Sequence, residues 1–219
     1  MDTPTFHQQA EDLREQEKFT EALDVYTKVI KNYYTELNYS GVVDALGGQS
    51  LTYKHLYLVD PQEKYLQLCR GSAQSSLEIA KQHHQDDLLF RCYFNLGEVD
   101  MLAKDYQSAV DNYQHSFDLI PNNSVEKCRA LSHLAEAQYY NGEKLNVNKN
   151  LIKSLDILHR YRSQVDDYTA NVWETGILMK LAAITNDQKY ITASEKIIDS
   201  DDRLIIRKRQ LEELKRKLK

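Results

Sequence analysis

Apolar residues recur every three or four positions along almost the whole chain, which is the spacing of an amphipathic helix. This pattern predicts about eleven helices that are separated by short polar breaks. Turn and capping residues mark several of the breaks, among them Asp60-Pro61, Pro121-Asn122 and Asn141-Gly142. The predicted helices cover residues 3–16, 19–35, 39–57, 61–83, 86–103, 106–119, 124–141, 145–161, 167–185, 188–199 and 202–217.

Residues 93–121 carry the most distinctive spacing in the chain, with Tyr93, Leu96-Gly97, Tyr106, Ala109, Tyr113 and Pro121 in that order. The offset of twelve between Gly97 and Ala109 returns in three other pairs, which are Ala10 and Ala22, Ala135 and Val147, and Leu181 and Ala193. A fifth pair, Leu46-Gly47 with Ala73, has a longer offset, which predicts a hairpin whose two helices are both lengthened around Asp60-Pro61. The units defined by these pairs begin near residues 3, 40, 90, 128 and 174.

The residues of 93–121 resemble the tetratricopeptide (TPR) repeat, with Asp100 as a departure where the TPR pattern has tyrosine. The wider unit spacing is similar to that of the extended TPRs of bacterial signalling receptors and cargo adaptors. The resemblance covers residues 3–200 and implies an all-α, right-handed α-solenoid of about five TPR-like helical hairpins. Small residues at the paired positions would let the helices approach closely, and stacking would bury the apolar face that one hairpin leaves open. Residues 1–200 are therefore interpreted as one helical repeat domain.

Residues 201–219 differ from the rest because they carry eight basic and four acidic side chains. An apolar stripe predicts that this segment is an amphipathic C-terminal capping helix; its members are Leu204, Ile205, Leu211, Leu214 and Leu218. Two alternatives stay open. Leucines at 204, 211 and 218 recur every seven residues, which would also suit a homodimer. The basic side chains would also suit an acidic or nucleic-acid partner, although such a run is more often a solvated face.

The composition excludes several classes of protein. Among 219 residues, seven glycines and three prolines are too few for the many turns of a strand-rich fold, and 21 aromatic residues argue against long disorder. No apolar run is long enough to span a membrane, and the first residues have no signal-peptide pattern. Three distant cysteines, Cys69, Cys92 and Cys128, suit reduced, buried thiols and a cytoplasmic protein.

No motif in the sequence indicates catalysis, a metal or a cofactor. Phosphate-binding loops, nucleophile elbows and zinc-protease motifs are all missing. The segment from His83 to Asp87 resembles metal ligands only superficially, because adjacent residues at a helix end point in different directions. We therefore expect a protein that is not an enzyme, with a solvated loop at 83–87 and no cofactor.

In the TPR family the first helix of each hairpin lines the concave surface. Spacings of four, seven and eleven residues along a first helix select the residues that would face a groove there. In the third unit these are Arg91, Asn95, Glu98 and Leu102; in the fourth, Arg129, His133, Glu136 and Tyr140; in the fifth, Thr175, Met179 and Ala182. Asn95 can donate to and accept from a peptide backbone, and arginines can bind a carboxylate through paired donors. Tyr140 and Met179 offer adaptable apolar surface.

The alternative for these residues is an ordinary solvated face on which Arg91, Glu98, Arg129 and Glu136 form ion pairs along or between helices. The resemblance implies a non-enzymatic scaffold that binds a protein or peptide segment in the concave groove. A self-assembling structural protein and the peptide-sensing half of a bacterial signalling receptor are the other hypotheses. In the receptor case no DNA-binding domain is expected ahead of Thr3. Nucleic acid and membrane are not expected partners.

Overall fold

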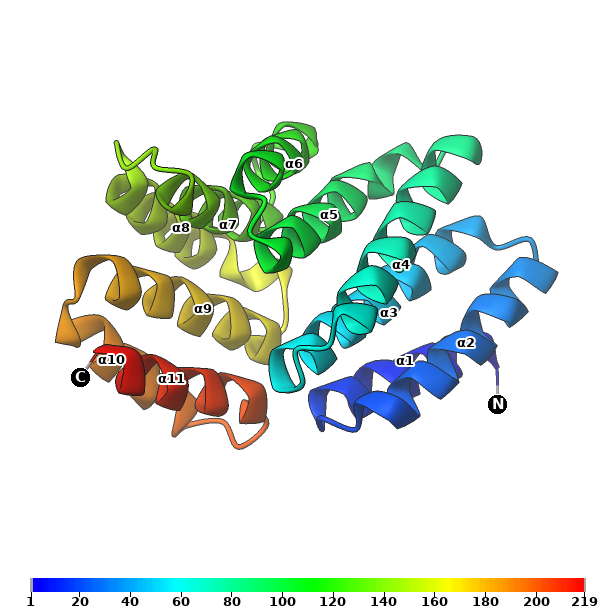
Figure 1. The fold of residues 1–219 in the computed structure, drawn as a ribbon, viewed down its shortest axis with the longest axis horizontal. Helices are drawn as coiled ribbons and strands as arrows, with labels where there is room; N and C mark the ends of the chain where they lie inside the picture. Colours follow the sequence, from blue (N-terminus) through cyan, green and yellow to red (C-terminus); the bar gives the residue numbers. More distant parts are fainter. Residues whose placement is uncertain (1, 219) are drawn as a thin grey trace. The chain divides into compact units, whose positions relative to one another are not determined.

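The computed structural model describes residues 2–218, and within them the chain contains eleven α-helices, two short 3₁₀ helices and no strand (Figure 1). Every predicted helix is present, with ends that differ from the prediction by a few residues at most. None of the helices in this part of the chain is both long and apolar enough to cross a membrane. The helices form two compact units, which meet in sequence between Leu119 and Ile120 and are described separately.

The first unit consists of three helical hairpins. Consecutive helices pack against each other, and α3 also contacts both α1 and α5, so the first helices of neighbouring hairpins touch directly. This arrangement lets each hairpin bury the apolar face of its neighbour. The hairpins are α1 (Thr3–Glu15) with α2 (Phe19–Thr35), α3 (Tyr39–Val59) with α4 (Glu63–Gln82), and α5 (Leu89–Ala103) with α6 (Tyr106–Leu119). The lengthening predicted around Asp60-Pro61 is confirmed, since α3 and α4 have 21 and 20 residues.

The second unit consists of two hairpins and a final helix. Its helices are α7 (Glu126–Tyr140), α8 (Val147–Tyr161), α9 (Asp167–Thr185), α10 (Gln188–Ile198) and α11 (Ile205–Leu218). Helix α11 packs on both α9 and α10, as α3 packs on both α1 and α2. The division into a repeat domain (1–200) and a C-terminal helix (201–219) stays a prediction; a loop at 199–204 separates α10 from α11.

Small residues allow the helices of a hairpin to approach closely, as the twelve-residue offset predicts. Ala10, Ala22 and Ala109 are completely buried, and a Cβ atom on Gly97 would lie 2.7 Å from the ring of Tyr113. The last hairpin differs from the prediction by one residue. Ala193 is only half-buried there, whereas Ser194 is completely buried, as is Ala182 twelve residues earlier.

The apolar stripe of α11 lies inside the second unit. Leu204 and Leu211 are buried in a cluster with Ile191 and Ile198 of α10. Two leucines of the seven-residue repeat therefore already have partners within the chain. Ile205, which the sequence places in the stripe, is exposed, and the next residue, Ile206, is buried instead.

Asp100, the departure from the TPR pattern, is a buried carboxylate in α5. It accepts hydrogen bonds from the Arg70 guanidinium of α4 at 2.9 Å and from the Asn112 carboxamide of α6 at 2.7 Å. Burial raises the pKa of Asp100, while these two donors act in the opposite direction. The side chain thus joins three consecutive helices through polar contacts in place of an aromatic ring.

We expect opposite effects from alanine at two helical glycines. Gly97→Ala should lower the free energy of unfolding by about 1–3 kcal/mol, because its Cβ would clash with the fully buried Tyr113 ring. Gly71→Ala is the matched control, since Gly71 is exposed in α4 and its Cβ would meet no atom within 4 Å. It should raise stability by about 0.5–1 kcal/mol. Urea unfolding of both variants measures the difference, and equal shifts would contradict close packing at Gly97.

The three cysteines should resist alkylation in the native protein. All are buried free thiols, and burial raises the pKa of Cys128 to about 12. A raised pKa keeps the thiol protonated and weakly nucleophilic at pH 8, so iodoacetamide should modify none of the three within minutes. In denaturant all three should react. Mass spectrometry counts the adducts, and rapid native modification of Cys128 would be inconsistent with this packing.

Candidate functional site

Two facing first helices of the first unit present the clearest polar surface, which we call the α3–α5 face. It consists of Asp44, Gly47 and Lys54 of α3 with Arg91, Asn95 and Glu98 of α5. Arg91 donates to Asp44 at 3.2 Å, and Lys54 pairs with Glu98. In the first pair the cation belongs to α5, and in the second it belongs to α3. Asn95 lies between Arg91 and Glu98 in the sequence of α5, and the positive and negative charges of the two pairs are equal in number.

Glu98 is the buried anchor of this face. The residue is 5% exposed, and besides the bond from Lys54 its carboxylate accepts a hydrogen bond from the Tyr113 hydroxyl of α6 at 2.5 Å. The same contact occurs in the first hairpin, where the Tyr26 hydroxyl donates to Glu11, also 15 residues earlier in the sequence. A buried carboxylate needs such partners because its desolvation is costly. Glu98 is therefore committed to internal contacts.

Asn95 is different, because its carboxamide makes no hydrogen bond to any residue that the structure describes, although the residue is only 7% exposed. The carboxamide lies over α3 at Gly47, where a Cβ atom would come within 2.8 Å of Nδ2. The next glycine, Gly48, leaves room for Tyr26 and Glu11 on the other side. The Gly47-Gly48 pair thus makes space for polar side chains from two neighbouring hairpins, as well as allowing close packing.

The second unit has a related surface, the α7–α9 face, formed by Arg129, His133 and Glu136 of α7 with Trp173 and Lys180 of α9. Lys180 pairs with Glu136 at 3.0 Å, and its Nζ lies 3.5 Å from Nε2 of His133. The Arg129 guanidinium lies over the Trp173 ring, 5.7 Å from the centroid. Here the cation of the cross-helix pair comes from the following first helix, whereas in the first unit Lys54 comes from the preceding one.

The structure places Arg91, Asn95 and Glu98 on the α3–α5 face of the first unit, and Arg129, His133 and Glu136 on the α7–α9 face of the second unit. The alternative to a binding groove was a solvated face whose charged residues form ion pairs along or between helices. All four charged residues do have such a partner, namely Arg91, Glu98, Arg129 and Glu136. Tyr140 is 48% exposed. Met179 is not on the α7–α9 face, because it is buried with Ile191 and Leu211; Thr175 and Ala182 are buried as well.

Sequence reasoning missed Lys180, which contacts both His133 and Glu136. The reason is a shift of one residue in α9, the same shift that exchanges Ala193 for Ser194 in α10. The buried Ala182 is the small residue of α9 that corresponds to Gly97 of α5. Lys180 precedes it by two residues, as Asn95 precedes Gly97, so this alignment places Lys180 on the face. Asp44 and Lys54 on α3 were not selected as binding residues either.

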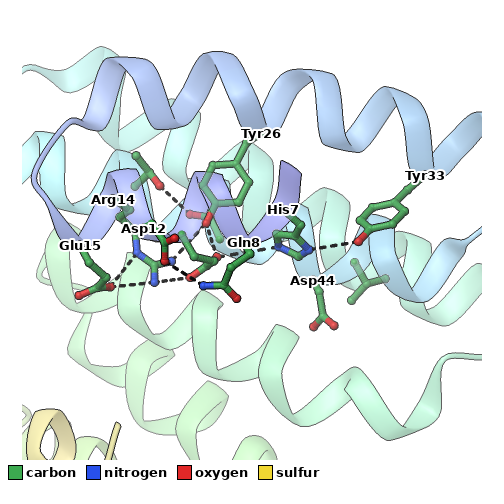
Figure 2. A network of polar contacts seen from close by, with 12 residues as sticks. His7, Gln8, Asp12, Arg14, Glu15, Tyr26, Tyr33 and Asp44 are labelled. Carbon is green, nitrogen blue, oxygen red and sulfur yellow. Dashed lines mark hydrogen bonds and ion pairs between the residues drawn. The ribbon is translucent and has the colours of Figure 1, made fainter. Parts of the chain in front are cut away.

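A third polar cluster lies at α1 and is drawn in Figure 2. Arg14 contacts Glu11 at 2.5 Å and Glu15 at 2.9 Å, and its guanidinium also donates to the Tyr26 hydroxyl at 3.4 Å. His7 lies 3.9 Å from Glu11 and 3.5 Å from the Tyr33 hydroxyl, and Figure 2 shows its contact with Tyr33. Burial raises the pKa of Tyr26, and the neighbouring Glu11 adds to this effect. The phenol therefore stays protonated and can donate to the carboxylate.

The residues of the segment 83–87 do not converge on an ion. Within residues 2–218, no group of three or more histidine, cysteine, aspartate or glutamate side chains is arranged to hold a metal. The segment forms the connection before α5, where Asp86–Leu88 is a 3₁₀ helix and His83 stacks on Tyr39.

Comparison with known proteins gives a consistent fold. No family model matches the sequence, and no curated protein matches it either. A solved Rap protein, complexed with Competence and Sporulation Factor, matches 99% of this chain at a TM-score of 0.67 and 13% identity. The chain spans 64% of that protein. Two structures of a kinesin-light-chain-like protein of Podosopora anserina with nearly identical TPR-like repeats match at a TM-score of 0.58, with 11% and 13% identity. They cover 98% and 99% of this chain, which in turn spans 95% and 98% of theirs.

These likenesses confirm the fold that the residues at 93–121 predict. The chain is an all-α protein of TPR-like helical hairpins. At such low identities the likeness concerns the fold alone.

The two ion pairs of the α3–α5 face should differ strongly in their effect on stability. Glu98→Ala should lower the free energy of unfolding by roughly 2–4 kcal/mol, because it removes the buried carboxylate that accepts from both Lys54 and the Tyr113 hydroxyl. Arg91→Ala should cost less than about 1 kcal/mol, since its pair with Asp44 is exposed. Chemical unfolding at low and high salt tests both, and equal losses would show that Glu98 is not a buried anchor.

Proposed function

We propose that the protein is a non-enzymatic scaffold that binds a protein or peptide segment along the first helices of its hairpins, with the α3–α5 face as the principal contact. The partner is a polypeptide, and the proposed binding residues are the solvent-accessible members of the two faces together with Tyr140, while Glu98 supports the α3–α5 face from inside. Three buried free thiols are compatible with a reducing compartment, so we place the protein in the cytoplasm.

The observation that carries this proposal is the unused carboxamide of Asn95. Asn95 as a residue is nine-tenths buried, yet its Oδ1 and Nδ2 atoms reach the surface, where a ligand can meet them. A peptide backbone presents one N–H and one C=O per residue, and a carboxamide can serve both at once. The exposed pair of Arg91 and Asp44 next to it can exchange its partners for charged groups of a ligand.

The Rap structure supports the proposal, because it shows that a protein of this fold can hold another molecule. It also favours a second candidate, the peptide-sensing half of a bacterial signalling receptor. The observation behind this candidate is the match of nearly the whole chain to 64% of the Rap protein. The two candidates differ in their ligand, which is a segment of a larger protein in the first and a free peptide in the second.

Selection of peptides tests the principal proposal. The immobilised full chain is exposed to a random dodecapeptide phage library, and enriched peptides are synthesised with a fluorescent label. Asn95→Ala should weaken their binding about tenfold or more in fluorescence anisotropy, because two hydrogen bonds of about 1 kcal/mol each are lost. Gln67→Ala is the matched control, since Gln67 is an exposed carboxamide on α4.

The contrary outcomes are equally clear. Peptides that bind Asn95→Ala as tightly as the native chain would remove the α3–α5 face from the proposal. A library that yields no enriched peptide would contradict the peptide-binding function itself. Circular dichroism and thermal unfolding of each variant exclude loss of the fold as the cause.

A further inference from the structure

We infer that the segment bound at the α3–α5 face carries a large apolar side chain about three to five residues from the residue that hydrogen-bonds to Asn95, and that this side chain packs on Leu58 and Leu102. This inference rests on the proposed function and specifies the chemistry of the partner. Its basis is the way in which the lengthened helix α3 continues the face toward and past the end of α5.

Helical spacing shows which side chains of α3 continue the face. Asp44, Gly47 and Lys54 already belong to it, because they contact residues of α5. Leu51 follows Gly47 by four residues, and Leu58 follows Lys54 by four. Residues at spacings of three and four lie on one side of an α-helix, one turn above another. Leu58 therefore extends the face toward the C-terminal end of α3.

Helix α5 supplies a matching apolar position. Leu102 follows Asn95 by seven residues and Glu98 by four, so it lies on the same side of α5 as both. It packs in part against the cluster that includes Leu96 and Val99, and it remains partly exposed. The face thus ends in leucines from both of its helices. We call this end the leucine patch, and its members are Leu51, Leu58 and Leu102.

The exposure of Leu58 follows from the unequal lengths of the two helices. Helix α3 has 21 residues and α5 has 15, and α5 ends at Ala103, directly after Leu102. Lys54 already pairs with Glu98, near the end of α5, and Leu58 lies about 6 Å farther along α3. Leu58 is consequently 49% exposed, although a leucine side chain gains free energy when it is removed from water.

Exposed leucines occur on many protein surfaces, and what distinguishes this patch is its continuity with an unused carboxamide. Asn95 makes no hydrogen bond to any residue among 2–218, and its polar atoms reach the surface. A segment that runs along the two helices meets the exposed pair of Arg91 and Asp44 on one side of Asn95 and the leucine patch on the other. The segment that satisfies Asn95 is therefore the one that covers the patch.

The ion pair next to the patch favours an apolar group over a charged one. Lys54 and Glu98 lie between Asn95 and Leu58 along the face, and their charges offset each other. Their side chains are only 21% and 6% exposed. A charged group of the ligand would have to compete with this pair, whereas an apolar group gains from covering the leucines.

The dimensions of the face set the spacing within the segment. Leu102 lies seven residues from Asn95, which is about 10 Å along α5, and Leu58 lies eleven residues from Gly47, which is about 16 Å along α3. Both distances start at one point, because a Cβ atom on Gly47 would lie 2.8 Å from Nδ2 of Asn95. An extended chain advances about 3.3–3.6 Å per residue, so it reaches the patch after about three to five residues.

The test uses the labelled dodecapeptides selected on the native full chain, which are long enough to reach from Asn95 to the patch. Leu58→Ser should weaken their binding about three- to tenfold in fluorescence anisotropy, because an apolar contact is lost. The loss should be the same at low and high salt, since it is not electrostatic. The matched control is Leu68→Ser, which should change binding less than twofold. Leu68 is 46% exposed in the same lengthened hairpin, but it lies on α4, outside the α3–α5 face.

Double-mutant cycles locate the apolar residue in the peptide. Each apolar residue of a selected peptide is replaced by alanine, and each backbone N–H is methylated in turn. One alanine replacement should couple to Leu58→Ser, so that the two changes together cost little more than either alone. That residue should lie about three to five positions from the N–H whose methylation couples to Asn95→Ala.

The outcomes separate this inference from the proposed function. Equal effects of Leu58→Ser and Leu68→Ser, or peptides without an apolar residue at that spacing, would overturn the inference, while a loss in Asn95→Ala would leave the proposed function standing. Peptides that bind Asn95→Ala as tightly as the native chain would remove both.

Sedimentation equilibrium of the free chains tests the other occupant of the patch, which is a second copy of this chain. A mass that halves in Leu58→Ser, together with an unchanged affinity for the peptides, would assign the patch to a dimer and overturn the inference. Equal masses of the native chain and the variant, with weakened peptide binding, support it. Circular dichroism of each variant excludes loss of the fold as the cause.

Discussion

The close approach of neighbouring helices at small residues is the constraint on which this structure depends. A single hairpin has more apolar surface than its two helices can bury between them, so each hairpin must be covered by the next. Ala10, Gly97 and Ser194 let the two helices within a hairpin approach closely, and a large ring such as that of Tyr113 packs against Gly97. The core therefore combines close contacts within each hairpin with contacts between neighbouring hairpins.

The same constraint decides what happens to polar side chains on the first helices. A carboxylate near a helix–helix contact is partly desolvated, and it is tolerated only with donors close by. Glu98 and Glu11 meet this requirement through a tyrosine hydroxyl of the following helix and through a cation, which is Lys54 in one case and Arg14 in the other. These buried carboxylates thus have their partners within the protein. The amide of Asn95 has none among the described residues, which makes it a functional candidate.

The fold and the α5 side of the α3–α5 face were predictable from the sequence, whereas the partners of these residues on α3 were not. Helix boundaries and the TPR-like units follow from local periodicity, and the glycine at 97 fixes the register of the third unit. The register of α9 and α10 lacks such a marker, because leucine, alanine and serine succeed one another at the critical positions. Met179 was therefore selected in place of Lys180. Cross-helix pairs such as Lys54 with Glu98 join residues 44 positions apart, and no local pattern contains that information.

Asp100 has a consequence for how the chain avoids mispairing. Hairpins that look alike can exchange between two copies of a protein, because an alanine or tyrosine contact is nearly the same in every repeat. The buried carboxylate of Asp100 is satisfied only when Arg70 approaches from the preceding helix and Asn112 from the following one. A hairpin from another position would leave a desolvated charge without donors. The polar residue that interrupts the repeat pattern thus favours the native order of α4, α5 and α6, because only these neighbours satisfy its carboxylate.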